Sequence, residues 1–342
     1  SSISPKKFTW YDTGNPEALD LARKHYSKKN IHNILEKENE AIWFVEDKVI
    51  KYSDSIDFIK NRVKRAKELK GFVPDIYSHS KHMYCYKKVK GEVLSKNVTL
   101  PIFEDFLKRS KEFWVKKKLD KDSSLNFHKK CLEFYKDKTI GRINLFYENF
   151  GQKDDAYSIN GEEVPSLNYL LNKIDWTWIS DGLAGRFHGD FHLENIIYFN
   201  QEKKFTFLDW RQDFAGDLSI GDIYYDFAKL LHGFIVNHGI IINNQYSASW
   251  NDNEIKFDLD RKKILINCEQ RFYEWIKENN YDLKKVKVLT GLIYLNIAAL
   301  HHFPYSILLY GSDKNKVCSK LIQFVYLFLS ISSMFGMLNI NF

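Results

Sequence analysis

The sequence has few cysteines, and their spacing excludes two kinds of stabilised small domain. Four occur in 342 residues, and no two stand at the CxxC spacing that is typical of zinc sites and redox motifs. A disulfide framework is not indicated either, because the cysteines are scattered through a long chain. Such scattered thiols favour a reduced, cytoplasmic protein. The four positions are Cys85, Cys131, Cys268 and Cys318.

The sequence also lacks an uninterrupted hydrophobic run. One charge-free stretch, residues 321–342, has the length of a membrane span, but seven Gln, Ser, Gly and Asn residues interrupt it. Polar groups at these positions would be costly in a lipid environment. We therefore expect a buried C-terminal helix here and no membrane span.

An excess of acidic residues is missing as well. The formal net charge is +7, which suits an anionic ligand such as a nucleotide but is equally typical of a lysine-rich solvated surface. No Lys/Arg run has the interleaved aromatic residues of a nucleic-acid platform, so we expect no nucleic-acid partner. The length allows two packed lobes with separate cores.

Hydrophobic patterns divide the chain into a β-rich part and a helical part. Residues 41–52 predict two strands around a turn at Glu46-Asp47, and apolar residues at helical spacing predict a helix from Ile56 to Leu69. Residues 75–94 predict further strand, and helical patterns dominate after Leu100. We expect a two-lobed α+β fold. Its parts are an N-terminal extension (1–29), a small nucleotide-binding lobe (30–96) and a larger helical lobe with the catalytic loop and acceptor site (97–342).

The stretch HGDFHLENIIYFNQEKKFTFLDW, residues 188–210, has the residue types that phosphoryl transfer needs. Asp190 and Asn195 lie on a predicted loop, and two short apolar runs joined by a polar turn lead to Asp209. A hairpin of this kind returns the chain on itself, so we expect Asp209 near Asn195. One carboxylate to accept a proton and two oxygen ligands for Mg²⁺ would then meet at one point.

These motifs resemble the aminoglycoside phosphotransferase and choline kinase branch of the protein-kinase-like fold. The resemblance rests on HGD with a downstream Asn, on LDW, and on the GDxxxDxA pattern of residues 221–228. It implies an ATP- and Mg²⁺-dependent small-molecule kinase. It further implies that Asp190 is the catalytic base, that Asn195 and Asp209 bind the metal, and that His188 and Asp226 support the catalytic loop.

The small lobe carries a matching nucleotide signal. Lys51 ends an apolar strand just before the capped helix, where kinases place the lysine that holds the α- and β-phosphates. Tyr84, Cys85 and Tyr86 resemble the hinge whose backbone binds adenine. Two departures stand out: residues 37–40 contain no glycine, and the helix has no acid where the partner of Lys51 is expected. Asp57 and Glu68 are the nearest candidates for that partner.

The acceptor itself is not defined by the sequence. We expect it over Asp190, against the C-terminal helices, in a region that includes Trp210, Arg211, Asp213, His301 and Tyr305. Surface-polysaccharide sugars and choline-like amino alcohols are the main alternatives. A cationic acceptor would need an aromatic cage, for which Trp176, Trp178 and Trp210 are candidates. An aminoglycoside would need many acids around the site, which the basic chain does not suggest.

The N-terminal segment carries a second resemblance. Residues 10–19, WYDTGNPEAL, are similar to the closing segment of sugar-nucleotide and phosphocholine nucleotidyltransferase domains, although Asn15-Pro16 also fits a plain helix start. With the missing initial Met, this predicts one half of a nucleotidyltransferase–kinase fusion. The rival hypothesis from another functional class is a non-catalytic pseudokinase that serves as a binding domain, suggested by the missing helix acid.

Overall fold

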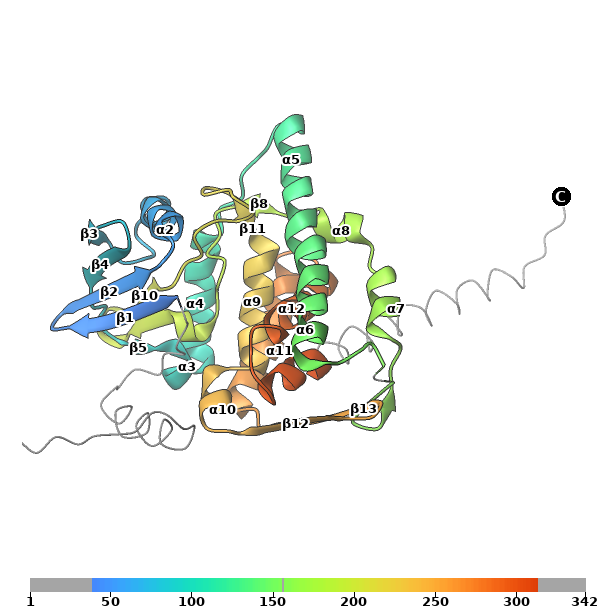
Figure 1. Ribbon diagram of the computed structural model, residues 1–342. Coiled ribbons are helices and arrows are strands. Elements are labelled where there is room, and N and C mark those ends of the chain that lie inside the picture. Colours follow the sequence, from blue (N-terminus) through green and yellow to red (C-terminus); the bar gives the residue numbers. More distant parts are fainter. Residues whose placement is uncertain (1–38, 156, 313–342) are drawn as a thin grey trace, which may run out of the picture. The chain divides into compact units, whose positions relative to one another are not determined.

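The computed structural model describes residues 39–155 and 157–312. The small lobe is a four-stranded antiparallel sheet of order β1-β2-β4-β3 (Figure 1). The predicted strand pair is present, and Glu46 adopts a φ of 53° in the turn that joins its two strands. The strands are β1 (Glu40–Val45), β2 (Lys48–Ser53), β3 (Ile76–His79) and β4 (Met83–Lys87).

One helix, α2 (Ile56–Glu68), completes this lobe, as the sequence predicts. The Ser55 hydroxyl accepts a hydrogen bond from the Phe58 N–H and caps its first turn. Ile59 and Val63 are buried on its inner face, and Arg62 and Arg65 share that face. Two arginines on a buried helix face require polar partners, because burial of an unpaired charge is costly.

The connection between the lobes passes through Gly91 and the short strand β5 (Glu92–Val93). This strand joins a three-stranded sheet of order β10-β9-β5 with β9 (Ile196–Phe199) and β10 (Lys204–Phe207). Gly91 has a φ of 115°, and a Cβ there would lie 2.4 Å from the Tyr198 carbonyl oxygen. Only glycine fits this close approach without a shift of the backbone.

The large lobe is built from helices. In Figure 1, α9 stands centrally, with α12 and α6 beside it and α4 toward the small lobe. A π-helical turn (Glu133–Asp137) joins α5 to α6. The longer helices are α4 (Leu100–Phe113), α5 (Lys121–Leu132), α6 (Lys138–Phe150), α9 (Ile223–Ile235), α11 (Lys263–Glu278) and α12 (Leu283–Ala298). Shorter ones are α3 (Leu94–Asn97), α7 (Leu167–Asn172), α8 (Trp176–Ser180) and α10 (His238–Ile242).

Two further sheets lie in the large lobe. A two-stranded pair of β8 (Ala184–Gly185) and β11 (Gly221–Asp222) lies on either side of residues 188–210 in the sequence. The other sheet has the order β12-β13-β6-β7. Its strands are β6 (Ser158–Ile159), β7 (Glu162–Glu163), β12 (Tyr246–Asn251) and β13 (Glu254–Leu259).

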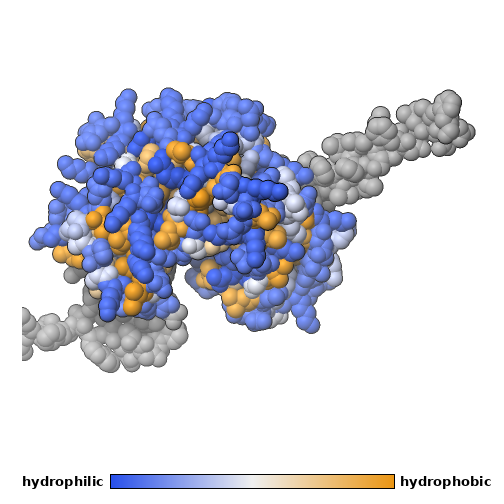
Figure 2. Space-filling model, turned by 90° about the horizontal axis from the view of Figure 1, so that it is seen from above, coloured by the Kyte–Doolittle hydropathy of each residue, from blue (hydrophilic) through white to orange (hydrophobic). Residues whose placement is uncertain are grey.

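The predicted two-lobed α+β architecture is confirmed. The surface seen in Figure 2 is mostly hydrophilic, with small hydrophobic areas scattered over it. Within the described residues, none of the helices has both the length and the apolar character that a membrane crossing requires. The predicted N-terminal extension and the C-terminal helix of residues 321–342 lie outside the described residues.

Candidate active site

The loop that carries Asp190 is held in place by hydrogen bonds to Asp226 of α9. The Asp226 carboxylate accepts hydrogen bonds from the backbone N–H groups of His188 and Gly189, both at 2.7 Å, and from the Trp114 indole at 3.0 Å. His188 is fully buried, and burial lowers its pKa to about 3, so its imidazole is neutral and accepts the Asp190 N–H. Asp226 and His188 therefore fix the backbone conformation on which Asp190 stands.

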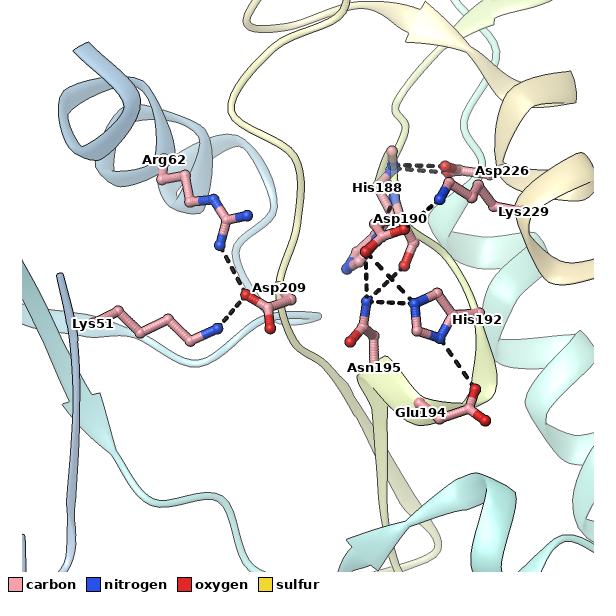
Figure 3. Close-up of polar contacts among 11 residues, drawn as sticks. Lys51, Arg62, His188, Asp190, His192, Glu194, Asn195, Asp209, Asp226 and Lys229 are labelled. Atoms are coloured by element: carbon pink, nitrogen blue, oxygen red, sulfur yellow. Dashed lines mark hydrogen bonds and ion pairs between the residues drawn. The ribbon is translucent and has the colours of Figure 1, made fainter. Parts of the chain in front are cut away.

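The Asp190 carboxylate lies among three polar side chains (Figure 3). The Lys229 ammonium group lies 2.8 Å from Asp190 Oδ1, and the Asn195 amide donates to Oδ2 at 3.1 Å. His192 Nε2 lies 3.5 Å from Oδ2. Burial by itself would raise the pKa of Asp190, but Lys229 and His192 together hold it well below its ordinary value. Asp190 is thus an oriented carboxylate at neutral pH.

His192 carries positive charge in this setting. Burial lowers its pKa, but the carboxylates of Asp190 and Glu194 outweigh that effect and raise it to about 9. Its Nδ1 lies 3.1 Å from Glu194 Oε2. The sequence pattern alone indicated no role for His192 or Lys229. Lys229 had a signal in the sequence, since it lies three residues after Asp226 and so on the same side of α9.

Asn195 and Asp209 meet at the ends of the β9–β10 hairpin, as the sequence predicts. The Leu208 N–H donates to the Asn195 carbonyl at 2.7 Å, which places residue 209 beside Asn195. The Asn195 amide nitrogen is bound to Asp190, so its amide oxygen faces the other way, toward Asp209 (Figure 3). Asp209 has a φ of 60°, an uncommon conformation for a residue other than glycine.

Asp209 is paired with two cations of the small lobe. Lys51 of β2 and Arg62 of α2 both contact its Oδ1, Arg62 at 2.8 Å. Burial raises the pKa of Asp209, but Lys51 and Arg62 hold it far below its ordinary range. The sequence left open which acid pairs with Lys51 and offered Asp57 and Glu68 as the nearest candidates. Lys51 pairs with neither of them but with Asp209, and α2 presents a second cation, Arg62.

Arg65, one turn along α2, also reaches the large lobe. It donates to the backbone carbonyls of Phe187, Arg211 and Leu218. Arg62 donates to the Tyr84 hydroxyl at 3.3 Å in addition to Asp209. Sequence reasoning missed both arginines, although their positions beside Ile59 and Val63 on the apolar stripe of α2 were visible. Charged residues on such a stripe indicate buried polar contacts.

The oxygen atoms gathered here fit a magnesium ion. Mg²⁺ prefers carboxylate and amide oxygens together with phosphate oxygens of a substrate. The Asn195 amide oxygen lies on the side toward Asp209, and the Asp209 carboxylate is turned toward Lys51, which could hold the phosphates (Figure 3). Among the described residues there is no group of three or more His, Cys, Asp and Glu side chains placed to hold a metal ion by themselves. The donor set therefore suits a metal that arrives with a nucleotide.

The predicted hinge requires a correction. Tyr84, Cys85 and Tyr86 lie in β4, which is an inner strand paired with β2 on one side and β3 on the other. Their backbone groups are therefore engaged in the sheet, and Tyr84 and Tyr86 are buried. The segment between the lobes is Lys88–Gly91, immediately after β4. Pairing on both edges of β4 was not visible from a single apolar run.

The predicted acceptor residues are spread over this region. Arg211 and Asp213 follow Asp209 on the loop, and Arg211 packs against Gly189. Tyr305 is buried against His301, with ring centroids 4.6 Å apart. Trp210 is 1% exposed and donates its indole N–H to the Arg62 carbonyl, so it offers no surface to an acceptor. For the remaining four residues, contact with an acceptor stays a prediction.

Replacing Asp226 by Asn should destabilise the fold and the catalytic loop together. An amide offers one acceptor oxygen where the carboxylate serves three N–H donors, and a buried donor left without a partner costs about 1–3 kcal/mol. We expect the free energy of unfolding in urea to fall by about that amount. Asp105→Asn, an exposed change on α4, should alter it by less than about 0.5 kcal/mol. Equal effects of the two changes would contradict this role.

The segment that contains these residues is similar to a known protein family. Residues 152–264 match the Phosphotransferase enzyme family. The match confirms the predicted resemblance to a phosphotransferase, and it includes Asp190, Asn195, Asp209 and Asp226. No curated protein is significantly similar to the chain in sequence.

Three solved structures are similar at low identity. The streptomycin–ATP complex of APH(2″)-IIa has a TM-score of 0.47 at 14% identity, with 88% of this chain and 98% of that chain covered. The Plasmodium vivax ethanolamine kinase has 0.45 at 12%, with 89% of each chain covered. The choline kinase from Cryptosporidium parvum Iowa II has 0.45 at 11%, with 92% and 97% covered. Likenesses of this size do not identify an acceptor.

Proposed function

We propose that the chain is an ATP- and Mg²⁺-dependent kinase that phosphorylates a hydroxyl group of a small molecule. One observation supports this most strongly. The Asn195 amide donates to the Asp190 carboxylate, Asp209 follows at the other end of the same hairpin, and Lys51 of the small lobe pairs with the Asp209 carboxylate (Figure 3). This is the combination of proton acceptor, metal ligands and phosphate-binding cation that phosphoryl transfer requires.

In the proposed reaction Asp190 accepts the proton of the attacking hydroxyl. Lys229 and the Asn195 amide hold its carboxylate in one orientation, and His192 adds positive charge beside it. Bound Mg²⁺ would neutralise the phosphate oxygens, with Asn195 and Asp209 as its protein ligands. Lys51 would bind phosphates, and adenine would lie against the Lys88–Gly91 connection. Most of the rate enhancement would come from position and charge.

The direct test is ATP turnover with a panel of hydroxyl compounds, which should include neutral sugars, sugar phosphates, hydroxy acids and amino alcohols. We expect ADP release that depends on both Mg²⁺ and one class of acceptor, with a phosphorylated product visible by mass spectrometry. ATP hydrolysis that no acceptor stimulates would contradict the proposal.

Arg62 should take part in nucleotide binding. It stands beside Lys51 on Asp209, so that negative phosphates near Asp209 would lie within reach of both cations. Replacing Arg62 by Gln should raise the KM for ATP about tenfold, which corresponds to roughly 1.4 kcal/mol. Lys64→Gln, on the exposed face of the same helix, is the matched control and should leave KM unchanged. If both variants shift KM equally, general surface charge explains the effect.

A non-catalytic pseudokinase is the second candidate. It is favoured by the occupation of Asp209 by two cations and by the absence of a helix acid beside Lys51. Such a protein would bind ATP without turning it over, even when every acceptor class is present. A titration with ATP and the turnover measurement together distinguish the two functions, because both proteins would bind ATP but only the kinase releases ADP.

Two finer features of the prediction stay proposals. A role in surface-polysaccharide synthesis would need a sugar or amino-alcohol acceptor, which the turnover panel identifies. Fusion to a nucleotidyltransferase domain rests on residues 10–19, outside the described residues. The complete reading frame decides this point: an upstream nucleotide-binding α/β domain would support fusion, and a start codon within a few residues of Ser1 would exclude it.

A further inference from the structure

A cavity of about 210 Å³ lies in the large lobe next to the catalytic loop. One wall is basic and is formed by Lys138 and Arg142 of α6, Arg211 of the loop after Asp209, and Lys229 of α9. We call these four side chains the basic wall. The apolar part of the lining, which we call the apolar wall, comes mainly from α12. Lys138, Arg142 and the α12 residues have no role in the phosphoryl-transfer site proposed above.

The basic wall adjoins the Asp190 carboxylate. Lys229 belongs to both, because its ammonium group lies 2.8 Å from Asp190 Oδ1. Arg211 packs against Gly189, where an added Cβ would lie 2.5 Å from the Arg211 Cβ. A compact molecule in this cavity would therefore have its reactive hydroxyl within one side chain of the proposed base. The volume suits a molecule smaller than a drug-sized ligand, because sites for drug-sized ligands span about 300–1,000 Å³.

The charges of the basic wall are poorly balanced. No aspartate or glutamate lines the cavity, and Lys138, Arg142 and Arg211 form no ion pair with the residues that the structure describes. Burial and the neighbouring Arg211, Lys229 and Arg142 lower the pKa of Lys138 to about 7, with Asp213 opposing the effect weakly. Like charges held together in a half-buried cavity repel one another strongly unless an anion lies among them.

We propose that the acceptor is an anionic hydroxyl compound, whose phosphate or carboxylate group binds the basic wall while its hydroxyl faces Asp190. This inference rests on the proposed kinase function and names its substrate class. Arginine and lysine together favour phosphate and carboxylate oxygens. The apolar wall from α12 would cover the carbon skeleton of the acceptor.

The same geometry disfavours a cationic acceptor. A quaternary ammonium group needs a free aromatic face, but the cavity's Phe134 ring already has Lys138 Nζ at 4.4 Å and Arg211 Cζ at 5.0 Å from its centroid. An amino alcohol or an aminoglycoside would also meet the basic wall, in which only Lys229 has an ion-pair partner among the described residues. Choline-like acceptors, which the sequence left open, are therefore set aside in this proposal.

The test compares acceptors that differ in charge but not in the hydroxyl offered. Suitable pairs are glycerol with glycerol 3-phosphate, glycerol with glycerate, and a neutral hexose with its phosphate; choline is the cationic member. We expect the anionic partner of at least one pair to give a kcat/KM at least 100-fold higher than its neutral partner. The phosphate and carboxylate pairs distinguish the two anion types. Preferred turnover of choline or a neutral sugar would overturn this inference while leaving the kinase function intact.

Variants of α6 test the wall itself without touching the catalytic loop. In the double variant Lys138→Met/Arg142→Met, the KM for the anionic acceptor should rise at least tenfold, while the KM for ATP stays unchanged. Lys129→Met, exposed on α5, is the matched control. Calorimetric titration with inorganic phosphate and with acetate adds a measurement that needs no turnover. Equal anion binding by wild type and double variant would overturn the inference whatever the enzyme phosphorylates.

Discussion

Replacing Asp190 by Asn should lower kcat by about 10²–10⁴-fold, the usual contribution of a general base. The amide has the same shape but cannot accept the hydroxyl proton as an ionised carboxylate does. Lys229 and His192, which now neutralise Asp190, would also lose their partner. The effect should appear in kcat for every acceptor, because the proton must leave in each case. Steady-state turnover with the preferred acceptor measures it directly.

ATP binding provides the internal control for this variant. The nucleotide contacts proposed here involve Lys51, Arg62 and Asp209, none of which touches Asp190 directly. The dissociation constant for ATP with Mg²⁺ should therefore change less than about threefold, or roughly 0.6 kcal/mol. Near-normal turnover by the Asp190→Asn enzyme would remove Asp190 as the base. Loss of nucleotide binding would instead indicate a disturbed fold.

Replacing Asp209 by Ala should abolish binding of ATP that depends on Mg²⁺. The change removes a proposed metal ligand and also the counter-charge of Lys51 and Arg62. Turnover should fall by at least about 10²–10³-fold, the loss seen when one preorganised charge is removed from a transition state. Calorimetric titration with ATP, with and without Mg²⁺, separates the metal contribution from binding by Lys51 and Arg62.

Stability must be measured beside binding, because Asp209→Ala leaves two buried cations unpaired. Removal of one partner of a buried ion pair can cost about 3–5 kcal/mol. Asp209→Asn is the matched variant, since it keeps the volume and one oxygen. We expect both variants to lose the Mg²⁺ dependence, with the Ala variant less stable in urea. A folded Asp209→Asn enzyme that still binds ATP more tightly with Mg²⁺ would contradict the metal assignment.

The candidate site was predictable where its residues lie close together in the sequence. Asp190, Asn195 and Asp209 occupy one loop and one hairpin, so their spacing alone indicated that they meet. Lys229 and Arg62 come from α9 and α2, and single-sequence patterns do not show which helix faces meet across two lobes. The contacts that tune Asp190 and Asp209 therefore appear only in the folded structure.

Strand arrangement was the weaker part of the prediction. The hinge was placed in β4 because an apolar run does not show whether one edge or both edges of a strand are paired. The β12–β13 pair was not predicted, although both of its strands, YSASWN and EIKFDL, alternate apolar and polar residues as half-buried strands do. The α2 helix was predicted well because capping and apolar spacing are local signals.

The double pairing of Asp209 has a mechanical consequence. Lys51 and Arg62 belong to the small lobe, and Asp209 belongs to the large one, so this carboxylate links the lobes in addition to the hydrogen bonds of Arg65. A polyphosphate that enters between them would compete for the same two cations. It would weaken the contact of Asp209 with Lys51 and Arg62 and replace it with contacts from its own oxygen atoms. Without nucleotide, the protein's own carboxylate occupies the position at Lys51 and Arg62 that a phosphate would take.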